Sequence, residues 1–154
     1  MHDNYESAIQ EVASHVFETS AFLSVFPLEE SADLPPPDFC ATMTFKGAAE
    51  GRVSMRIAGE VLDTIVDNLL EMESDPEEQM KRRKDVLKEM LNMLCGNLLT
   101  AHFGSSPVFD LSPPEVIESA EMPAPTAEDV RRALLNIEHT LAEVMFEVQN
   151  RQNS

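Results

Sequence analysis

A polar pair interrupts an otherwise apolar stretch, "EMLNMLCGN", at residues 89–97. Glu89 and Asn92 are three residues apart, so in a helix their side chains are neighbours about one turn apart. A glutamate accepts hydrogen bonds or pairs with a cation, and an asparagine amide both donates to and accepts from water. Such a pair could hold a lysine and orient a water nucleophile. The same two residues are also ordinary on the wet side of a helix, and their spacing alone does not decide between the two interpretations.

The segment that carries this pair has the start and stop signals of one long helix. Asp75 can cap it, Pro76 suits the first helical position, and Glu78 completes the spacing of a capping box. Gly104 suits a left-handed terminator. The sequence therefore predicts a helix over about residues 76–103.

Helical periodicity sets the direction in which the pair points. At 100° per residue, Asp85, Glu89, Asn92 and Gly96 share one narrow stripe. We expect Glu89 and Asn92 to point outward, with Gly96 leaving an uncrowded spot beside them and marking the place where a kink would form. The opposite face, which we expect to be the core face, is formed by Leu87, Met90, Leu91, Leu94, Leu98 and Ala101.

Other segments supply the scaffold for this helix. Apolar spacing predicts a first helix over about residues 3–20 and a short buried helix over about 60–72. Two alternating segments, "FCATMTFKG" and "RVSMRIAG", predict a hairpin around the turn "GAAEG". The proline-rich "LEESADLPPPDF" is expected to be a surface linker, "SPVFDLSPPEVI" an edge strand ended by Pro113 and Pro114, and "ESAEMPAPTAED" a loop.

The C-terminal segment 127–149 fits two structures. Val130, Leu134, Ile137 and Leu141 fall on a helical stripe, with Thr126 as a possible cap. The same segment also fits two alternating strands on either side of "EHT". Periodicity alone leaves the choice between helix and hairpin open.

Charge and length restrict the class of protein. The 154 residues and 43% hydrophobic content fit a single domain. With 28 acidic and 11 basic residues, the net charge of -17 disfavours nucleic acid and anionic membrane surfaces as partners. No stretch is apolar for the roughly 18 residues of a membrane span, and the N-terminus lacks the pattern of a secretory signal. We therefore expect a soluble, cytoplasmic protein.

Familiar catalytic and metal-binding motifs are missing from the sequence. Cys40 and Cys95 lie in apolar surroundings far apart, as expected of two reduced core thiols. There is no nucleophile elbow and no phosphate-binding glycine loop. We expect no metal site in this chain. The histidines are isolated from one another, at His2, His15, His102 and His139.

The motif "DVLKEMLNMLCGN" resembles the E-x-x-N signature helix of the chemotaxis phosphatases of the CheC, CheX and FliY group. In that group a leading acid, the Glu and Asn pair, and a following Gly-Asn recur together. The matching positions here are Asp85, Glu89, Asn92, Gly96 and Asn97. The order of elements over about residues 5–118 is also similar to CheX, with weaker support than the helix itself.

The resemblance implies an α+β fold, in which a mixed or antiparallel sheet packs against about three helices. It also implies strands rather than a helix in the C-terminal segment. CheC-like members can carry a second Glu and Asn pair on the first helix, where this chain has Glu11 and Ser14. The resemblance to CheX is therefore closer, with one site and, by analogy, a homodimer formed through the sheet.

As a function, the resemblance implies hydrolysis of the aspartyl phosphate on a CheY-like response-regulator receiver. Glu89 would pair with a lysine of the receiver, and Asn92 would position the attacking water. Asp85, Lys88 and Gly96 would contact the partner. The chain itself would bind no cofactor, because the Mg²⁺ of this chemistry belongs to the receiver. The alternative is a non-catalytic CheX-like module that binds a receiver or another signalling or motor protein.

Two further features near the motif have a structural and a functional interpretation. The basic cluster "KRRK", residues 81–84, is either a solvated helix face or a contact to an acidic receiver surface. Asn97 is expected to make a structural hydrogen bond. Besides the phosphatase and the non-catalytic binding module, a third possibility is that the polar stripe of this helix has no such function and faces only solvent or a dimer partner.

Overall fold

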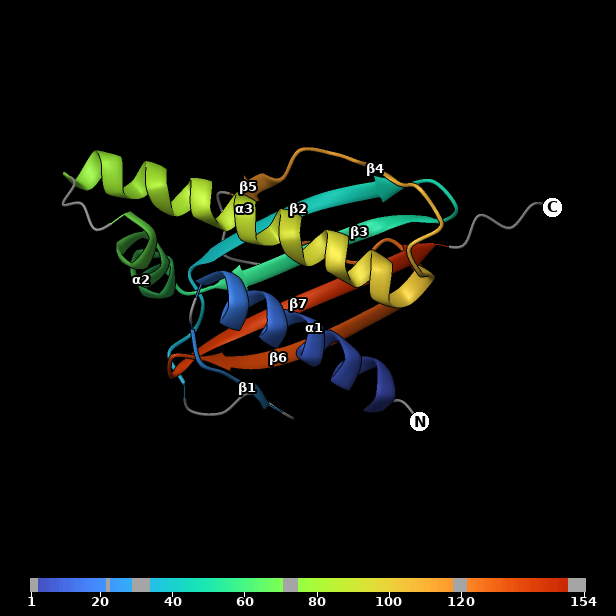
Figure 1. The fold of residues 1–154 in the computed structure, drawn as a ribbon, viewed down its shortest axis with the longest axis horizontal. Helices are drawn as coiled ribbons and strands as arrows, with labels where there is room; N and C mark the ends of the chain where they lie inside the picture. The colour runs from blue at the N-terminus through green and yellow to red at the C-terminus, as the bar shows by residue number, and fades with distance from the viewer. Residues whose placement is uncertain (1–2, 22, 29–33, 71–74, 118–121, 150–154) are drawn as a thin grey trace.

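The protein is built from one antiparallel sheet with helices over one of its faces (Figure 1). In this computed structural model, α1 and α3 run in opposite directions across the sheet, and α2 packs against α3. The α+β prediction is therefore confirmed. The structure describes residues 3–21, 23–28, 34–70, 75–117 and 122–149.

The three helices lie close to their predicted positions. They span Asp3–Ala21 (α1), Gly59–Leu70 (α2) and Pro76–Phe103 (α3). Residues 71 and 72, which were predicted to end the second helix, lie outside the described residues. Helical spacing of apolar residues located the first two helices, and the capping signals located the third.

The first turn of α3 confirms the local signals in the sequence, whereas Gly104 after its last turn has a positive φ but, with ψ -179°, not the left-handed helical conformation that was expected. The Asp75 carboxylate accepts a hydrogen bond from the Glu78 amide at 2.9 Å, and Pro76 opens the helix. At the other end Gly104 has φ 83°, and its amide donates to the Thr100 carbonyl at 2.9 Å. The helix is unbroken at Gly96. Its 28 residues therefore form one rigid support for the polar pair.

Within the described ranges the sheet has seven strands, each paired antiparallel to its neighbours. Its order is β1-β6-β7-β3-β2-β4, and β5 pairs with β2 on the same side as β4. The predicted hairpin is confirmed as the β2–β3 pair. The strands are β1 Val25–Leu28, β2 Phe39–Lys46, β3 Glu50–Ile57, β4 Asp110–Leu111, β5 Glu115–Ile117, β6 Asp129–Ile137 and β7 Thr140–Gln149.

Three short edge strands, β1, β4 and β5, differ from the expectations. The apolar residues after α1 include β1, which was not predicted, and Pro27 is accommodated because this strand pairs only with β6. The predicted edge strand in "SPVFDLSPPEVI" is in fact two pieces, β4 and β5, on either side of Pro113 and Pro114. Two to four residues are too few for a clear alternation of side chains.

The C-terminal segment forms the hairpin β6–β7, so the strand interpretation is correct. β7 lies between β6 and β3, near the middle of the sheet, and residues 140–148 are all buried. Because both of its faces are covered, burial along β7 does not alternate. Apolar residues on both faces also fit a helical stripe, so periodicity did not choose between helix and hairpin.

The turn of this hairpin offers a test of local strain. Glu138 and His139 both have positive φ, 49° and 66°. Two-residue hairpin turns of this kind favour Asn-Gly, because most other side chains are strained there. We expect the double substitution Glu138→Asn with His139→Gly to stabilise the protein by about 1 kcal/mol. Urea unfolding followed by circular dichroism would measure it, and a lower midpoint for the variant would contradict the prediction.

The core lies between the sheet and the helices. Its largest fully buried side chains come from all three helices and from β2, β3, β6 and β7. Ala101, expected on the core face of α3, is exposed, and Cys95 and Leu99 are buried instead. The largest fully buried side chains are Phe17, Phe45, Phe146, Met43, Met55, Ile57, Leu62, Ile65, Leu87, Leu91, Leu94 and Leu135.

Candidate functional site

The polar pair on α3 faces solvent. Glu89 and Asn92 are both exposed. On the opposite side of the helix, Leu87, Leu91 and Leu94 are completely buried against the sheet. Burial of this apolar face fixes the rotation of α3 about its axis. The pair therefore points away from the core, as the periodicity predicted.

The side chains of the pair have no partners among the described residues. Neither Glu89 nor Asn92 forms a hydrogen bond or ion pair with any described residue. Asp85 and Lys88 are exposed and likewise form no ion pair or hydrogen bond with the described part of the chain. Gly96 is half-buried, and a Cβ placed there would meet nothing within 4 Å. The helix thus presents an acid, an amide and an open spot that are all available to another molecule.

Asn97 behaves differently from Asn92. Its amide nitrogen donates to the Met93 carbonyl at 2.7 Å, within the same helix. This bond fits the predicted structural role, although the side chain is exposed. The two asparagines on α3 are thus distinguished by what their amides already bind.

An ion pair between α2 and α3 holds the start of the site helix. Arg83 donates from two nitrogens to the carboxylate of Asp63, with 2.6 Å from Nε to Oδ1, and Gln79 donates to the same oxygen at 2.5 Å. The hydrogen bonds from Arg83 lower the pKa of Asp63, against the effect of its partial burial. The guanidinium also lies 5.7 Å from the ring centre of Phe39 on β2. No sequence signal pointed to this pair, because its members are 20 residues apart on different helices.

A shallow pocket of about 440 Å³ lies on the surface between α1 and the C-terminal half of α3. Glu11 and His15 line it from α1, and Asn97 and Thr100 line it from α3. Glu11 is exposed and Ser14 is half-buried, so the first helix does present its acid to solvent. The asparagine that would complete a second pair is absent from this position.

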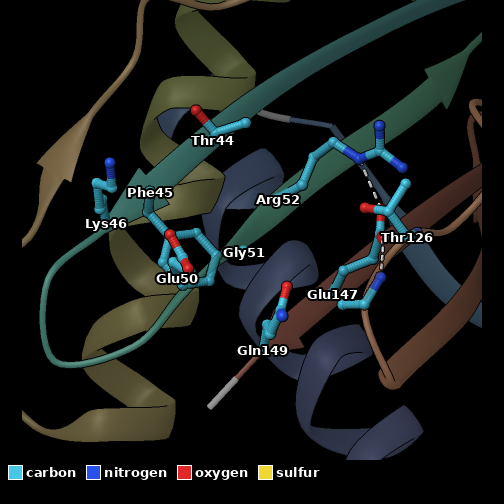
Figure 2. Close-up of a pocket in the computed structure, with 10 residues that line it drawn as sticks. Thr44, Phe45, Lys46, Glu50, Gly51, Arg52, Thr126, Glu147 and Gln149 are labelled. Carbon is cyan, nitrogen blue, oxygen red and sulfur yellow. Dashed lines mark hydrogen bonds and ion pairs between the residues drawn. The ribbon is translucent and has the colours of Figure 1, made fainter. Parts of the chain in front are cut away.

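A separate pocket of about 370 Å³ lies on the side of the sheet away from α1 and α3 (Figure 2). Arg52 Nε donates to the Glu147 carboxylate at 2.6 Å, and Arg52 Nη2 donates to the Ala124 carbonyl at 2.6 Å. Glu147 also accepts the Thr126 amide at 2.7 Å. These bonds tie the loop before β6 to the sheet. Neither Glu89 nor Asn92 lines this pocket, and we assign its ion pair a structural role.

The remaining expectations about reactive groups concern cysteines, metals and membranes. Cys40 and Cys95 are buried and unpaired, and burial raises their pKa values to about 11 and about 12. Both thiols are therefore protonated at neutral pH. Within the described ranges, no three His, Cys, Asp or Glu side chains are grouped as a metal site would need. No helix in the described part of the chain is long and apolar enough to cross a membrane.

Solved structures with the same fold come from chemotaxis proteins. A chemotaxis protein CheX from Desulfovibrio desulfuricans matches with a TM-score of 0.75 and 17% identity, over 95% of this chain and 99% of that one. A CheX from Vibrio vulnificus matches with a TM-score of 0.72 and 18% identity, over 97% and 99% of the two chains. The CheX–CheY–BeF₃–Mg²⁺ complex from Borrelia burgdorferi matches with a TM-score of 0.67 and 19% identity, over 94% and 97%. At these identities the matches establish the fold.

Comparison of the sequence with protein families assigns the chain more specifically than the fold does. No curated protein matches it significantly. The family model described as chemotaxis phosphatase CheX matches residues 39–138, a segment that begins with β2, ends in the β6–β7 turn and contains all of α3. The chain therefore belongs to the CheX family of chemotaxis phosphatases.

Proposed function

We propose that this protein hydrolyses the aspartyl phosphate of a CheY-like receiver domain. The observation that carries the proposal is the exposed, unpaired Glu89 and Asn92 pair on a rigid, capped helix. Membership of the CheX family supports the reaction class. The Borrelia burgdorferi structure, solved with CheY, BeF₃ and Mg²⁺, supports a receiver as the partner.

The proposed mechanism relies on position rather than on covalent chemistry. Glu89 pairs with a lysine beside the receiver's phosphate, and this ion pair fixes the orientation of the two proteins relative to each other. Asn92 enters the phosphate pocket and orients a water molecule in line with the phosphorus. Phosphoryl transfer needs little beyond such positioning and charge neutralisation. The Mg²⁺ that neutralises charge is bound by the receiver, and this chain contributes no cofactor.

Asp85, Lys88 and Gly96 complete the proposed contact surface. Asp85 and Lys88 flank Glu89 on the exposed side of α3, and Gly96 lets the partner approach the helix backbone closely. By the same family analogy we propose a homodimer formed through the sheet. A receiver substrate also implies that the protein acts in the cytoplasm.

The decisive experiment is a dephosphorylation assay. Receivers from the same genome are phosphorylated with a small phosphodonor, and loss of the phosphoryl group is followed with and without this protein. Faster loss with one receiver supports the proposed function. Binding to a receiver without faster loss would favour the alternative, a non-catalytic CheX-like module.

Gly96 provides a test that separates function from folding. A glycine inside a helix costs about 1 kcal/mol relative to alanine, and a methyl group at this position would meet no other atom. We therefore expect Gly96→Ala to raise the free energy of unfolding by about 0.5–1 kcal/mol. The same variant should dephosphorylate the receiver more slowly, because the methyl group stands where the partner approaches. A variant that is more stable and fully active would contradict a contact at Gly96.

A further inference from the structure

Arginines and lysines have different surroundings in this protein. None of the lysines in the described ranges forms an ion pair or a hydrogen bond. They are Lys46, Lys81, Lys84 and Lys88. Every described arginine, in contrast, lies within ion-pair distance of a carboxylate. These arginines are Arg52, Arg56, Arg82, Arg83, Arg131 and Arg132.

Three of the unpaired lysines share one flank of α3. Lys81, Lys84 and Lys88 are spaced by three and four residues, which places them along the same side of a helix. Lys81 and Lys88 are exposed and Lys84 is half-buried. Asp85 lies one turn from both Lys81 and Lys88, yet it forms no ion pair with either. We call these three residues the lysine flank; it runs beside the stripe that carries Glu89.

A groove lined by both apolar and charged side chains adjoins the lysine flank. It is a pocket of about 290 Å³ between the N-terminal half of α3 and β5. Met80 is 40% exposed at the groove, and Lys84 also lines it. The other lining residues are Asp38, Phe39, Val116 and Ile117. The groove therefore offers apolar contacts beside the Lys84 ammonium, and the Asp38 carboxylate that also lines it already accepts the Gly59 amide at 2.6 Å.

We propose that the lysine flank and this groove together dock an acidic, partly apolar segment of the phosphorylated receiver. This inference rests on the proposed function and extends its contact surface. Lys81 lies about 12 Å along the helix axis from Glu89 at 1.5 Å per residue. A typical interface covers about 800 Å² of each partner, so a receiver centred on Glu89 and Asn92 also reaches the lysine flank.

Charge explains why such a surface is needed. The chain carries a net charge of -17, and the aspartyl phosphate of the proposed receiver substrate is itself an anion. Two negative surfaces repel each other unless positive charge is concentrated at the contact. The lysine flank supplies that charge beside the site. Its members form no ion pair with the carboxylates of the described ranges, so docking breaks none of the ion pairs seen there.

Charge reversals at matched positions test the lysine flank. Lys81→Glu and Lys84→Glu are compared with Lys46→Glu, which makes the same change in net charge at the end of β2. The two flank variants should raise the KM for the phosphorylated receiver about threefold to tenfold, and change kcat much less. The difference should shrink between about 0.05 M and 0.5 M salt, because screening shortens the reach of the charges. Lys46→Glu should stay within about twofold of the unmodified protein.

A second pair of variants tests the groove. Met80→Gln removes an exposed apolar contact at the groove, and Val108→Gln makes a similar change at an 84% exposed position elsewhere. Only Met80→Gln should weaken binding, by about threefold or more. Thermal unfolding of each variant confirms that both remain folded.

Binding is measured separately from hydrolysis. The receiver is activated with beryllofluoride and Mg²⁺, which holds it in a stable phosphorylated-like state, and is titrated with each variant. Weaker binding by the flank variants supports docking even if no hydrolysis occurs, in which case only the proposed function fails. Equal affinity of Lys81→Glu, Lys84→Glu and Lys46→Glu, or no receiver binding at all, overturns the docking surface. Hydrolysis that is unaffected by the flank variants overturns docking and leaves the proposed function standing.

Discussion

Replacing Asn92 by alanine should slow receiver dephosphorylation by about 30-fold to 1,000-fold, while the protein stays folded. The loss corresponds to about 2–4 kcal/mol of barrier, the scale of one lost transition-state donor. The physical reason is that the amide would hold the attacking water in line, and a methyl group cannot. Single-turnover loss of phosphate from the receiver, with the phosphatase in excess, measures this step directly.

Although Asn92→Ala should slow the reaction, it should not make the folded protein less stable. The Asn92 side chain is exposed and makes no hydrogen bond to any described residue. Alanine is also a better helix former than asparagine by up to about 0.7 kcal/mol. Asn92→Ala should therefore unfold at the same or a slightly higher temperature. A clear fall in the melting temperature would mean that Asn92 has a structural role instead.

Asn97 provides the matched control. It is the same residue type on the same helix, exposed as well, but its amide already donates to the Met93 carbonyl. Asn97→Ala should keep most of the activity because this side chain is not expected to reach the phosphate. Equal losses from the two substitutions would argue against a water held specifically by Asn92.

Replacing Glu147 by glutamine should lower the free energy of unfolding by about 3 kcal/mol, the scale for breaking a buried ion pair. Glu147 is only 1% exposed, and its carboxylate accepts hydrogen bonds from Arg52 and from the Thr126 and Ala127 amides. Glutamine keeps the shape but places an NH₂ group among donors and leaves the guanidinium without its counter-charge. Urea unfolding measures the loss. Glu50→Gln is the control, because Glu50 lines the same pocket but forms no bond with any described side chain.

The same carboxylate makes the stability depend on pH. Burial by itself raises the pKa of Glu147, but the hydrogen bonds from Arg52, Thr126 and Ala127 outweigh it and hold the pKa below its ordinary value of 4.5. The unfolded chain therefore takes up a proton at a higher pH than the folded protein does. The stabilisation is complete above the unfolded value and is lost as the pH falls through the folded one. The difference in stability between the unmodified protein and Glu147→Gln should be constant near neutral pH and shrink in acid; a constant difference down to pH about 3 would contradict this.

The sequence by itself determined the site helix. Capping signals at Asp75 and Gly104 are contained in residues a few positions from the helix ends, so they could be recognised without knowledge of the fold. The apolar period of α3 likewise predicted that Glu89 and Asn92 face outward, because a helix can bury only one side against a sheet. The exception was Ala101, which lies near the end of α3 and is exposed.

The arrangement of the strands could be predicted only in part from the sequence. Residues 127–149 fit a helical stripe as well as two alternating strands, so the hairpin was preferred over a helix only through the resemblance to CheX; in the fold, burial along β7 does not alternate because both of its faces are covered. β1 was missed because a four-residue edge strand is defined by its pairing with β6, more than 100 residues away. Pairing over such distances leaves no local periodic signal.

The surroundings of the charged residues were decided by the tertiary structure alone. "KRRK" is one run of four cations in the sequence, but in the fold Arg83 binds Asp63 of α2, while Lys81 and Lys84 stay unpaired. Likewise Arg52 and Glu147 are 95 residues apart and meet only because β3 and β7 are neighbours. Helical period and capping depend on residues close in the chain, whereas ion pairing depends on which elements pack together. The sequence therefore predicted where the acid and amide point, and the packing decided which positive charges are left to meet a partner.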